Sequence, residues 1–247
     1  MEITFLGTNG WYDTGTGNTP GILIRSRDHD ILFDAGYGIA KADRYLSGEK
    51  PVHLFLSHFH IDHIAGLHTL AKFRFPQGLT IYGQPGTNEI LDSILRSPFT
   101  VPLSRLPYPV SVTELDEGRH TTPFPLECRY LVHPSPCFGY RFCLEGKIVA
   151  ICMDTGYCDN AVRLAEGADL LITECAFRSG MDTSDWPHLR PEDAIRIWRE
   201  SGAKQLTLMH FDASLYPDIS DRREIFSRFG QDYPTLRIAE DGMQIRI

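Results

Sequence analysis

Long apolar runs are missing from this sequence, and no uninterrupted stretch approaches the roughly 18 residues that a membrane-spanning helix needs. A secretory leader is missing as well, because Met1 to Thr4 begins a strand-like pattern in place of a basic segment followed by an apolar one. We therefore expect a cytoplasmic protein that makes no membrane contact.

Paired cysteines and an excess of positive charge are also absent. The six cysteines form no C-x-x-C pair and no regular framework, which predicts reduced, mostly buried thiols and argues against a zinc ribbon. The chain has 24 Lys and Arg residues against 32 Asp and Glu residues, a net charge of -8. Because a broad grip on nucleic acid requires a basic face, the composition favours small substrates.

The glycine-rich stretch from Gly7 to Gly17 lacks the residue order of a P-loop, and no helix pattern follows it. We interpret it as a loop that faces a functional site. Four prolines between residues 97 and 109 predict a second irregular segment, which would lie over a sheet edge or over the site entrance.

A chain of 247 residues with 42% hydrophobic residues can form one layered domain, which we expect to span residues 1–247. Strand-rich runs with helices between them occur twice, which predicts two sheets packed face to face with helices outside. The expected strands are 2–7, 21–25, 30–33, 52–56, 79–82, 110–115, 126–132, 138–144, 147–151, 170–173, 205–209, 236–238 and 244–247. The expected helices are 39–46, 64–73, 87–95, 160–166, 191–201 and 221–229.

Three histidines and one aspartate stand within six positions, directly after the apolar run 52–56: His58, His60, Asp62 and His63. Imidazole nitrogens with a carboxylate suit zinc, manganese or iron better than magnesium or calcium, which prefer oxygen ligands. In an extended chain His58 and His60 point to the same side, which leaves Asp62 and His63 to turn toward a second position. One loop can therefore supply ligands to two neighbouring ions.

Further candidate ligands follow apolar strands elsewhere in the chain: His133, Asp154 and His210. Each precedes a turn-like element, so a layered fold can deliver all three to one edge of its sheets. Any one of them taken alone could be an ordinary polar residue at a strand end. Together with the histidine-rich loop they favour one shared site.

This series of motifs resembles the metallo-β-lactamase-fold hydrolases over nearly the whole chain. Three further stretches are similar to the ribonuclease Z-like phosphodiesterase branch of that family: Thr4 to Thr8, Leu32 to Gly36 and Phe138 to Arg141. The resemblance implies an α/β, four-layer αβ/βα sandwich, with two mixed β-sheets packed face to face. The site would lie at one edge, between the two halves.

The resemblance also implies a dinuclear centre of two divalent metal ions, with zinc as the first choice and manganese or iron as alternatives. One ion would be bound by His58, His60 and His133. The other would be bound by Asp62, His63 and His210. Asp154 would bridge the two ions.

Two residues resemble the catalytic pair of the ribonuclease Z-like enzymes. Glu174 stands at a strand end, and His188 precedes a helix, where the family's glutamate orients its second catalytic histidine. Leu189-Arg190 replaces the family's usual Ser-Thr after that histidine. Outside the family, His188 would be an exposed loop histidine beside Trp186 and Pro187.

Other polar residues receive smaller roles. Asp34 is expected to fix a ligand imidazole from behind. Tyr140 and Arg141 are expected as weak substrate contacts. We expect no functional role for the histidines without a matching motif position, which are His29, His53, His68 and His120.

Ribonuclease Z carries a long basic arm between the histidine and the aspartate that His133 and Asp154 match. In this chain one compact hairpin around Glu145-Gly146 fills that interval, so tRNA is an unfavourable partner. We predict a phosphodiesterase that acts on a small or cyclic phosphodiester or nucleotide-like substrate. A hydroxide bridging the two ions would attack phosphorus, with Asp62 holding it and His188 donating to the leaving oxygen or clasping the phosphate.

Several alternatives stay open at this point. The ligand set suits a carboxyl-ester, lactone or thioester hydrolase of the same fold equally well, and a ribonuclease Z-type tRNA 3′-endonuclease remains a further reading. A diiron redox protein is disfavoured by His60, where such proteins usually have a carboxylate. A metal-bearing binding module is disfavoured by Glu174 and His188. The sequence is also compatible with a homodimer.

Overall fold

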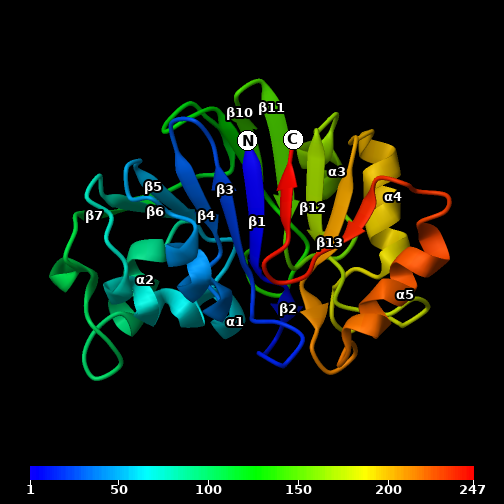
Figure 1. The fold of residues 1–247 in the computed structure, drawn as a ribbon, viewed down its shortest axis with the longest axis horizontal. Coiled ribbons are helices and arrows are strands. Elements are labelled where there is room, and N and C mark those ends of the chain that lie inside the picture. Colours follow the sequence, from blue (N-terminus) through cyan, green and yellow to red (C-terminus); the bar gives the residue numbers. More distant parts are fainter.

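Two seven-stranded mixed sheets form the centre of the computed structural model, which describes residues 1–247 (Figure 1). The first sheet has the order β16 (Gln244–Arg246), β1 (Glu2–Gly7), β3 (Gly21–Arg25), β4 (Asp30–Phe33), β5 (Val52–Phe55), β6 (Leu79–Gly83) and β7 (Val110–Glu114). The second has the order β15 (Leu236–Ile238), β13 (Leu206–Met209), β12 (Leu170–Glu174), β11 (Lys147–Cys152), β10 (Phe138–Leu144), β9 (Leu126–Tyr130) and β8 (Gly118–His120). A small parallel pair joins β2 (Asn9–Gly10) to β14 (Phe211–Asp212).

Helices cover the outer face of each sheet. The first sheet carries the 3-10 helices η1 (Tyr37–Arg44), η2 (Ala65–Lys72) and η3 (Leu103–Arg105) and the α-helices α1 (Ile61–Ile64) and α2 (Thr87–Ile94). The second carries α3 (Asp159–Ala165), α4 (Pro191–Ser201) and α5 (Ile219–Phe229). Three apolar clusters separate these layers, one between the two sheets and one under each set of helices. The expected αβ/βα sandwich is confirmed.

Local chemistry explains why the helices of the second half begin where they do. Pro191 occupies the first turn of α4, where its missing N–H costs no hydrogen bond, and Gly202 ends the helix with a φ of 65°. In α5 the side chains of Asp218 and Asp221 each accept from the other's backbone N–H and so form a capping box. These helices match the predicted ones within two residues at each end.

The two helices predicted at 39–46 and 64–73 are present within two residues of the predicted bounds, and they are largely 3-10 helices. The Gly66 N–H leaves the helical ladder to donate to the Ala35 carbonyl at 2.7 Å, and the Ile39 N–H bonds three residues back, to Gly36. The first bond joins segments that are distant in the sequence, so the apolar spacing does not reveal it, and the second is the local pattern of a 3-10 helix. The proline-rich segment 97–109 leads to the edge strand β7 and lines no part of the cavity described below.

Parallel pairing brings the functional loops to one edge. Strands β4, β5 and β6 run parallel, as do β11, β12 and β13, so the carboxyl ends within each set point the same way. Two bonds join the sheets there: the Phe138 N–H donates to the Ser57 carbonyl at 2.8 Å, and the Tyr140 hydroxyl donates to the Leu56 carbonyl at 3.0 Å. In Figure 1 this edge lies near α1 and β2. None of the helices is long and apolar enough to cross a membrane.

Candidate metal centre

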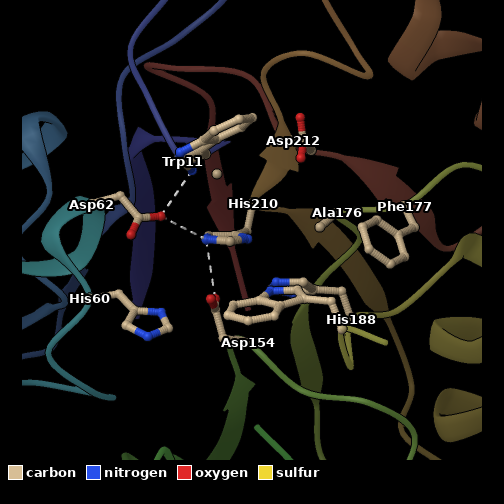
Figure 2. Close-up of a pocket in the computed structure, with 11 residues that line it drawn as sticks. Trp11, His60, Asp62, Asp154, Ala176, Phe177, His188, His210 and Asp212 are labelled. Carbon is tan, nitrogen blue, oxygen red and sulfur yellow. Dashed lines mark hydrogen bonds and ion pairs between the residues drawn. The ribbon is translucent and has the colours of Figure 1, made fainter. Parts of the chain in front are cut away.

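A cavity of about 250 Å³ opens at this edge between the two sheets (Figure 2). Its lining combines imidazoles, carboxylates and apolar side chains: Gly10, Trp11, His60, Asp62, Asp154, Ala176, Phe177, Trp186, His188, His210 and Asp212. No lysine or arginine lines the cavity. Positive charge for an anionic ligand must therefore come from protonated imidazoles or from bound cations.

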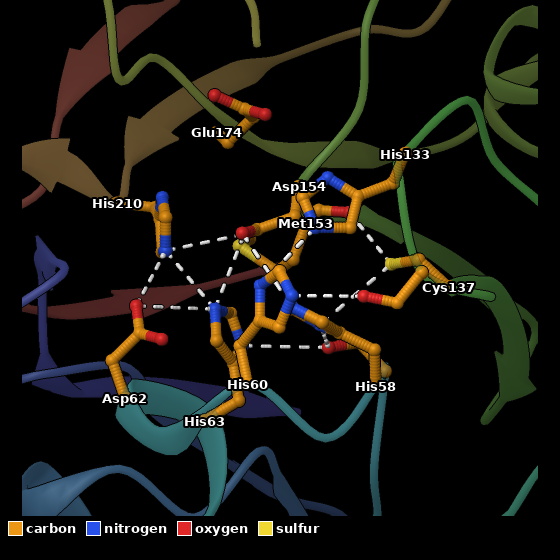
Figure 3. A network of polar contacts seen from close by, with 12 residues as sticks. His58, His60, Asp62, His63, His133, Cys137, Met153, Asp154, Glu174 and His210 are labelled. Carbon is orange, nitrogen blue, oxygen red and sulfur yellow. Dashed lines mark hydrogen bonds and ion pairs between the residues drawn. The ribbon is translucent and has the colours of Figure 1, made fainter. Parts of the chain in front are cut away.

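Figure 3 shows the first group of candidate ligands, which are three histidines close to Asp154. His58 and His60 follow β5, and His133 follows β9. The His60 Nδ1 and His133 Nε2 atoms are 3.2 Å apart, and the His58 ring lies 4.5 Å from that of His60 and 4.9 Å from that of His133, centroid to centroid. These three imidazoles and the Asp154 carboxylate offer ligand atoms within 4.8 Å of one another.

The second group of candidate ligands consists of one aspartate and two histidines. Asp62 and His63 stand in the short helix α1, and His210 follows β13. The Nε2 atoms of His63 and His210 are 3.0 Å apart, and the His210 Nε2 lies 3.3 Å from Asp62 Oδ2. The fold therefore brings His63 and His210, which are 147 positions apart in the sequence, into one cluster.

Asp154 stands between the two groups. Its Oδ1 lies 3.2 Å from His63 Nε2 and 3.1 Å from His210 Nε2, while its Oδ2 lies 3.7 Å from His58 Nε2. The residue is 3% exposed. One carboxylate thus faces imidazoles of both groups.

Three residues at strand ends have a left-handed backbone, which non-glycine residues rarely adopt. Their φ angles are 54° for Asp34, 43° for Asp154 and 56° for His210. Each such conformation costs on the order of 1–3 kcal/mol and persists only where the surroundings impose it. The left-handed backbone at these positions directs the side chains into the cluster, and its strain lowers the local stability.

Asp34 supports the cluster from behind. Its Oδ2 accepts hydrogen bonds from His63 Nδ1 and from the Ser57 hydroxyl, both at 2.8 Å, and its Oδ1 accepts from the Ser57 N–H at 2.7 Å. The bond to Nδ1 fixes the ring and leaves His63 Nε2 free to face the other candidate ligands. In the same way, the Ser135 hydroxyl lies 2.8 Å from His60 Nε2, so His60 presents Nδ1.

Unpartnered buried atoms test whether a cation fits these residues. The buried His58 Nε2 and Asp154 Oδ1 atoms make no hydrogen bond of acceptable geometry, although Oδ1 lies close to the imidazoles of His63 and His210. Leaving such atoms unpaired is costly, and a divalent cation would satisfy both of them. The donor set of imidazole nitrogens and carboxylate oxygens matches the preference of zinc and similar ions, so the cluster is able to bind metal.

The two groups differ in how strongly protons compete for them. Burial lowers the pKa of His58 well below its usual value and that of His133 to about 4, so both are neutral near pH 7. Burial also disfavours charge on His63 and His210, but the neighbouring Asp154 and Asp62 carboxylates outweigh it and raise the pKa of both. A cation must therefore displace protons from the second group.

We predict that acidification removes metal from the two groups in sequence. The raised pKa values of His63 and His210 mean that protons compete for the Asp62 group at a higher pH than for the His58 group. Metal content measured after dialysis between pH 8 and pH 4 should therefore fall in two steps. A single step that empties both groups together would contradict this difference.

Glu174 and His188 form a second buried unit beside the cluster. Glu174 Oε1 accepts from His188 Nδ1 at 2.7 Å and from the Thr155 N–H at 2.6 Å, while Oε2 accepts from the Ala176 and Leu189 N–H groups at 3.1 and 3.2 Å. All four bonds hold the carboxylate, which in turn orients the imidazole. Burial disfavours a charged His188, but Glu174 outweighs it and raises the His188 pKa to about 9.

Gly10 packs directly against a candidate ligand. A Cβ atom at this position would lie 2.7 Å from His210 Cε1 and 2.8 Å from His210 Nδ1, which is closer than real contacts allow. The strand pairing of β2 with β14 leaves Gly10 little freedom to move away. Any side chain here must therefore displace the His210 imidazole.

The substitution Gly10→Ala should weaken metal binding by the Asp62 group. The added methyl pushes His210 out of place, and changes to the groups that orient a ligand typically cost about 10–100-fold in metal affinity. Competition with a chromogenic chelator measures the loss. The matched control is Gly15→Ala in the same loop, where a Cβ would meet nothing within 4 Å, and equal affinities of the two variants would contradict the prediction.

The structure corrects two expected substrate contacts. Tyr140 is fully buried between the sheets, and its hydroxyl donates a hydrogen bond to the Leu56 carbonyl. The Arg141 guanidinium bonds to the carbonyls of Leu164 and Glu166 at the end of α3, away from the cavity. Neighbouring residues of one strand point to opposite faces, and neither of these faces reaches the site.

Several residues at the site were missed from the sequence. Trp186, Phe177 and Asp212 line the cavity, and Ser135 contacts His60, although only Phe177 falls in a family-like stretch, the one that carries Glu174. A further signal was the position of Trp186, two residues before His188. Trp11 falls in the glycine-rich loop that was expected to face a site, and its N–H donates to Asp62 Oδ2 at 2.9 Å.

Comparison with known proteins places the chain in a wider group. The profile of the family described as "Beta-lactamase superfamily domain" matches residues 29–211. A protein named probable metallo-hydrolase YhfI from Bacillus subtilis is 29% identical over 220 residues, covering 85% of this chain and 86% of the relative. The crystal structure of YhfI has a TM-score of 0.79 at 26% identity and covers 99% of this chain and 98% of its own. The predicted family resemblance is confirmed.

Ribonucleases are similar too. Ribonuclease Z from Staphylococcus carnosus is 29% identical over 302 aligned positions, covering 96% of each chain. Since 96% of 247 residues is about 237, about 65 of those positions have no counterpart here. The structure of the short form of human tRNase Z has a TM-score of 0.78 at 24% identity and covers 100% of this chain and 99% of its own, which supports the fold.

Proposed function

This chain belongs to the beta-lactamase superfamily and is a metal-dependent hydrolase, and we propose that its substrate is a small or cyclic phosphodiester. The proposal takes residues 1–247 as one functional domain. The observation that carries it is the Glu174–His188 pair, whose imidazole lines the same cavity as the candidate ligands His60, Asp62, Asp154 and His210.

We propose two ions in this centre, with zinc as the first choice and manganese or iron as alternatives. His58, His60 and His133 would hold one ion, Asp62, His63 and His210 the other, and Asp154 would contact both. When bound, the ions would activate water near neutral pH and offset negative charge on the phosphoryl group. The unpartnered His58 Nε2 and Asp154 Oδ1 atoms support this arrangement.

The protein's own residues would then complete the reaction. Asp62, which the Trp11 N–H holds from one side, would act as a ligand and orient the attacking water. Water forms the new P–O bond as the bond to the leaving group breaks. His188 would donate its Nε2 proton to the departing oxygen, since its Nδ1 is already held by Glu174.

A small substrate is favoured over tRNA by what surrounds the cavity. The interval between His133 and Asp154 consists of the β10–β11 hairpin, and about 65 positions of the ribonuclease Z relative have no counterpart in this chain. The cavity lining has no lysine or arginine to follow a polyanionic backbone. The single negative charge of a simple diester can be neutralised by the ions and by a protonated His188.

A substrate panel tests this choice. The zinc-loaded protein should hydrolyse methyl p-nitrophenyl phosphate and a 2′,3′-cyclic nucleotide at least 100-fold faster than it hydrolyses a simple lactone, and it should leave precursor tRNA uncut. Protein stripped with a chelator serves as the blank. Faster turnover of the lactone would favour a carboxyl-ester hydrolase, and cleavage of precursor tRNA would favour a ribonuclease Z-type activity.

The substitution His188→Ala should slow hydrolysis of diesters with alkyl leaving groups by about 10²–10⁴-fold, the usual contribution of a general acid. Esters of p-nitrophenol should be slowed far less, because that leaving group needs no proton. Metal content should stay at the wild-type level. His68→Ala, which removes an exposed histidine outside the cavity, is the matched control, and equal slowing of both ester types would remove the acid role.

The pH profile of alkyl diester hydrolysis provides a further test. His188, with its pKa raised to about 9, is protonated below that pH, so activity should fall as the pH rises through its pKa. Bound cations would shift this alkaline limb of the pH profile, where activity falls, to a somewhat lower pH. Glu174→Gln removes the charge that raises the pKa and should move the limb lower still, whereas an unmoved limb would contradict the pairing.

A further inference from the structure

We propose that Trp11 and Trp186 form an aromatic specificity element that binds a planar ring carried by the substrate. The inference deepens the proposed function, since it names the class of group attached to the phosphoryl centre in the same cavity. The ring is either a simple aryl group or a nucleobase. Both offer a flat π-face to an indole.

Trp186 stands next to the first ligand group and to the acid. Its ring lies 6.4 Å from that of His60 at an interplanar angle of 18°, and 6.1 Å from that of His133 at 84°. The His188 ring is also 6.4 Å away. Although these contacts cover part of the indole, 46% of Trp186 is exposed, and the residue lines the cavity.

Trp11 stands beside the second ligand group. Its backbone N–H donates to Asp62 Oδ2 at 2.9 Å (Figure 2). The residue is 66% exposed. Tyr12 packs edge-on against it, with ring centroids 5.2 Å apart. The two indoles therefore flank the two ligand groups and leave large apolar surfaces open to water beside the reacting position.

The loop that carries Trp11 is anchored from below by a buried arginine. Arg222 of α5 is fully buried, and its guanidinium donates to Thr8 Oγ1 and Thr16 Oγ1, each at 3.1 Å, and to Asn9 Oδ1. Trp11 itself has a φ of 74°, a costly conformation for a bulky residue. The buried polar bonds of Arg222 thus hold the loop in place against the backbone strain at Trp11, although the exposed Trp11 side chain gains little from its own packing.

Apolar residues continue this surface into the cavity, where Phe177 and Ala176 lie beside His188. With no lysine or arginine in the lining, the cavity offers its ligand imidazoles and aromatic faces beside its carboxylates. Cations and imidazoles suit a phosphoryl group, and aromatic faces suit a ring. An alkyl phosphodiester would use the cations and imidazoles and leave the indoles uncovered.

The test compares ligands that differ only in the ring. Isothermal titration calorimetry on the zinc-loaded full chain would measure phenyl phosphate against methyl phosphate, and adenosine 5′-monophosphate against ribose 5-phosphate. We expect the ring-bearing member of at least one pair to bind about 5- to 100-fold more tightly, the range of one base stacked on an aromatic side chain. A larger preference in the adenosine pair assigns a nucleobase, and a larger one in the phenyl pair assigns a simple aryl group.

The variants Trp186→Leu and Trp11→Leu should each reduce that preference at least threefold, with affinity for the ringless ligands and metal content unchanged. Trp186→Phe and Trp11→Phe should retain most of it. Phe226→Leu, which removes a 46% exposed aromatic of α5 outside the cavity, should change nothing.

Equal binding within both pairs, or a preference that survives both leucine variants, would overturn the inference. Absence of any phosphate-ester binding would overturn it as well. Because binding is measured without turnover, this test and the test of the proposed function can fail independently of each other. Ring-selective binding without diester hydrolysis would remove the proposed function alone, and diester hydrolysis without ring selectivity would remove this inference alone.

Discussion

The Asp154 carboxylate carries a negative charge into a region almost closed to solvent, and the surrounding imidazoles make that charge tolerable. Its two oxygens face His63 and His210 on one side and His58 on the other. A buried charge of this kind is stable only with partners, and cations would complete the set. Everything else at the site depends on bringing ligands from both sheets within reach of this one side chain.

The sandwich meets that demand through strand direction. Parallel strands in each sheet end at the same edge, so short loops can present Asp34, His58, Asp154 and His210 without long excursions. Left-handed backbone at three of these strand ends shows where the geometry is forced. The large apolar core between the sheets offsets the strain energy of these backbone conformations and keeps the strand ends in register.

Much of this could be predicted from the sequence, because metal ligands cluster in motifs and strands and helices leave periodic patterns. The dense loop from His58 to His63 marks the site by itself, and strand-end positions mark His133, Asp154 and His210. Residues that act through shape leave no such mark. Trp11, Trp186 and Gly10 reach the cavity because distant chain segments fold together, whereas Tyr140, which stands in a family-like stretch, turns into the core.

Metal stoichiometry of one variant tests the two-ion account most directly. The wild-type protein, saturated with zinc and freed of excess metal by gel filtration, should carry two ions per chain. Asp154→Asn should carry at most one, while the control Asp212→Asn, an acidic residue of the same cavity outside the ligand groups, should keep both. A folded Asp154→Asn protein that retains two ions at wild-type affinity would contradict the account.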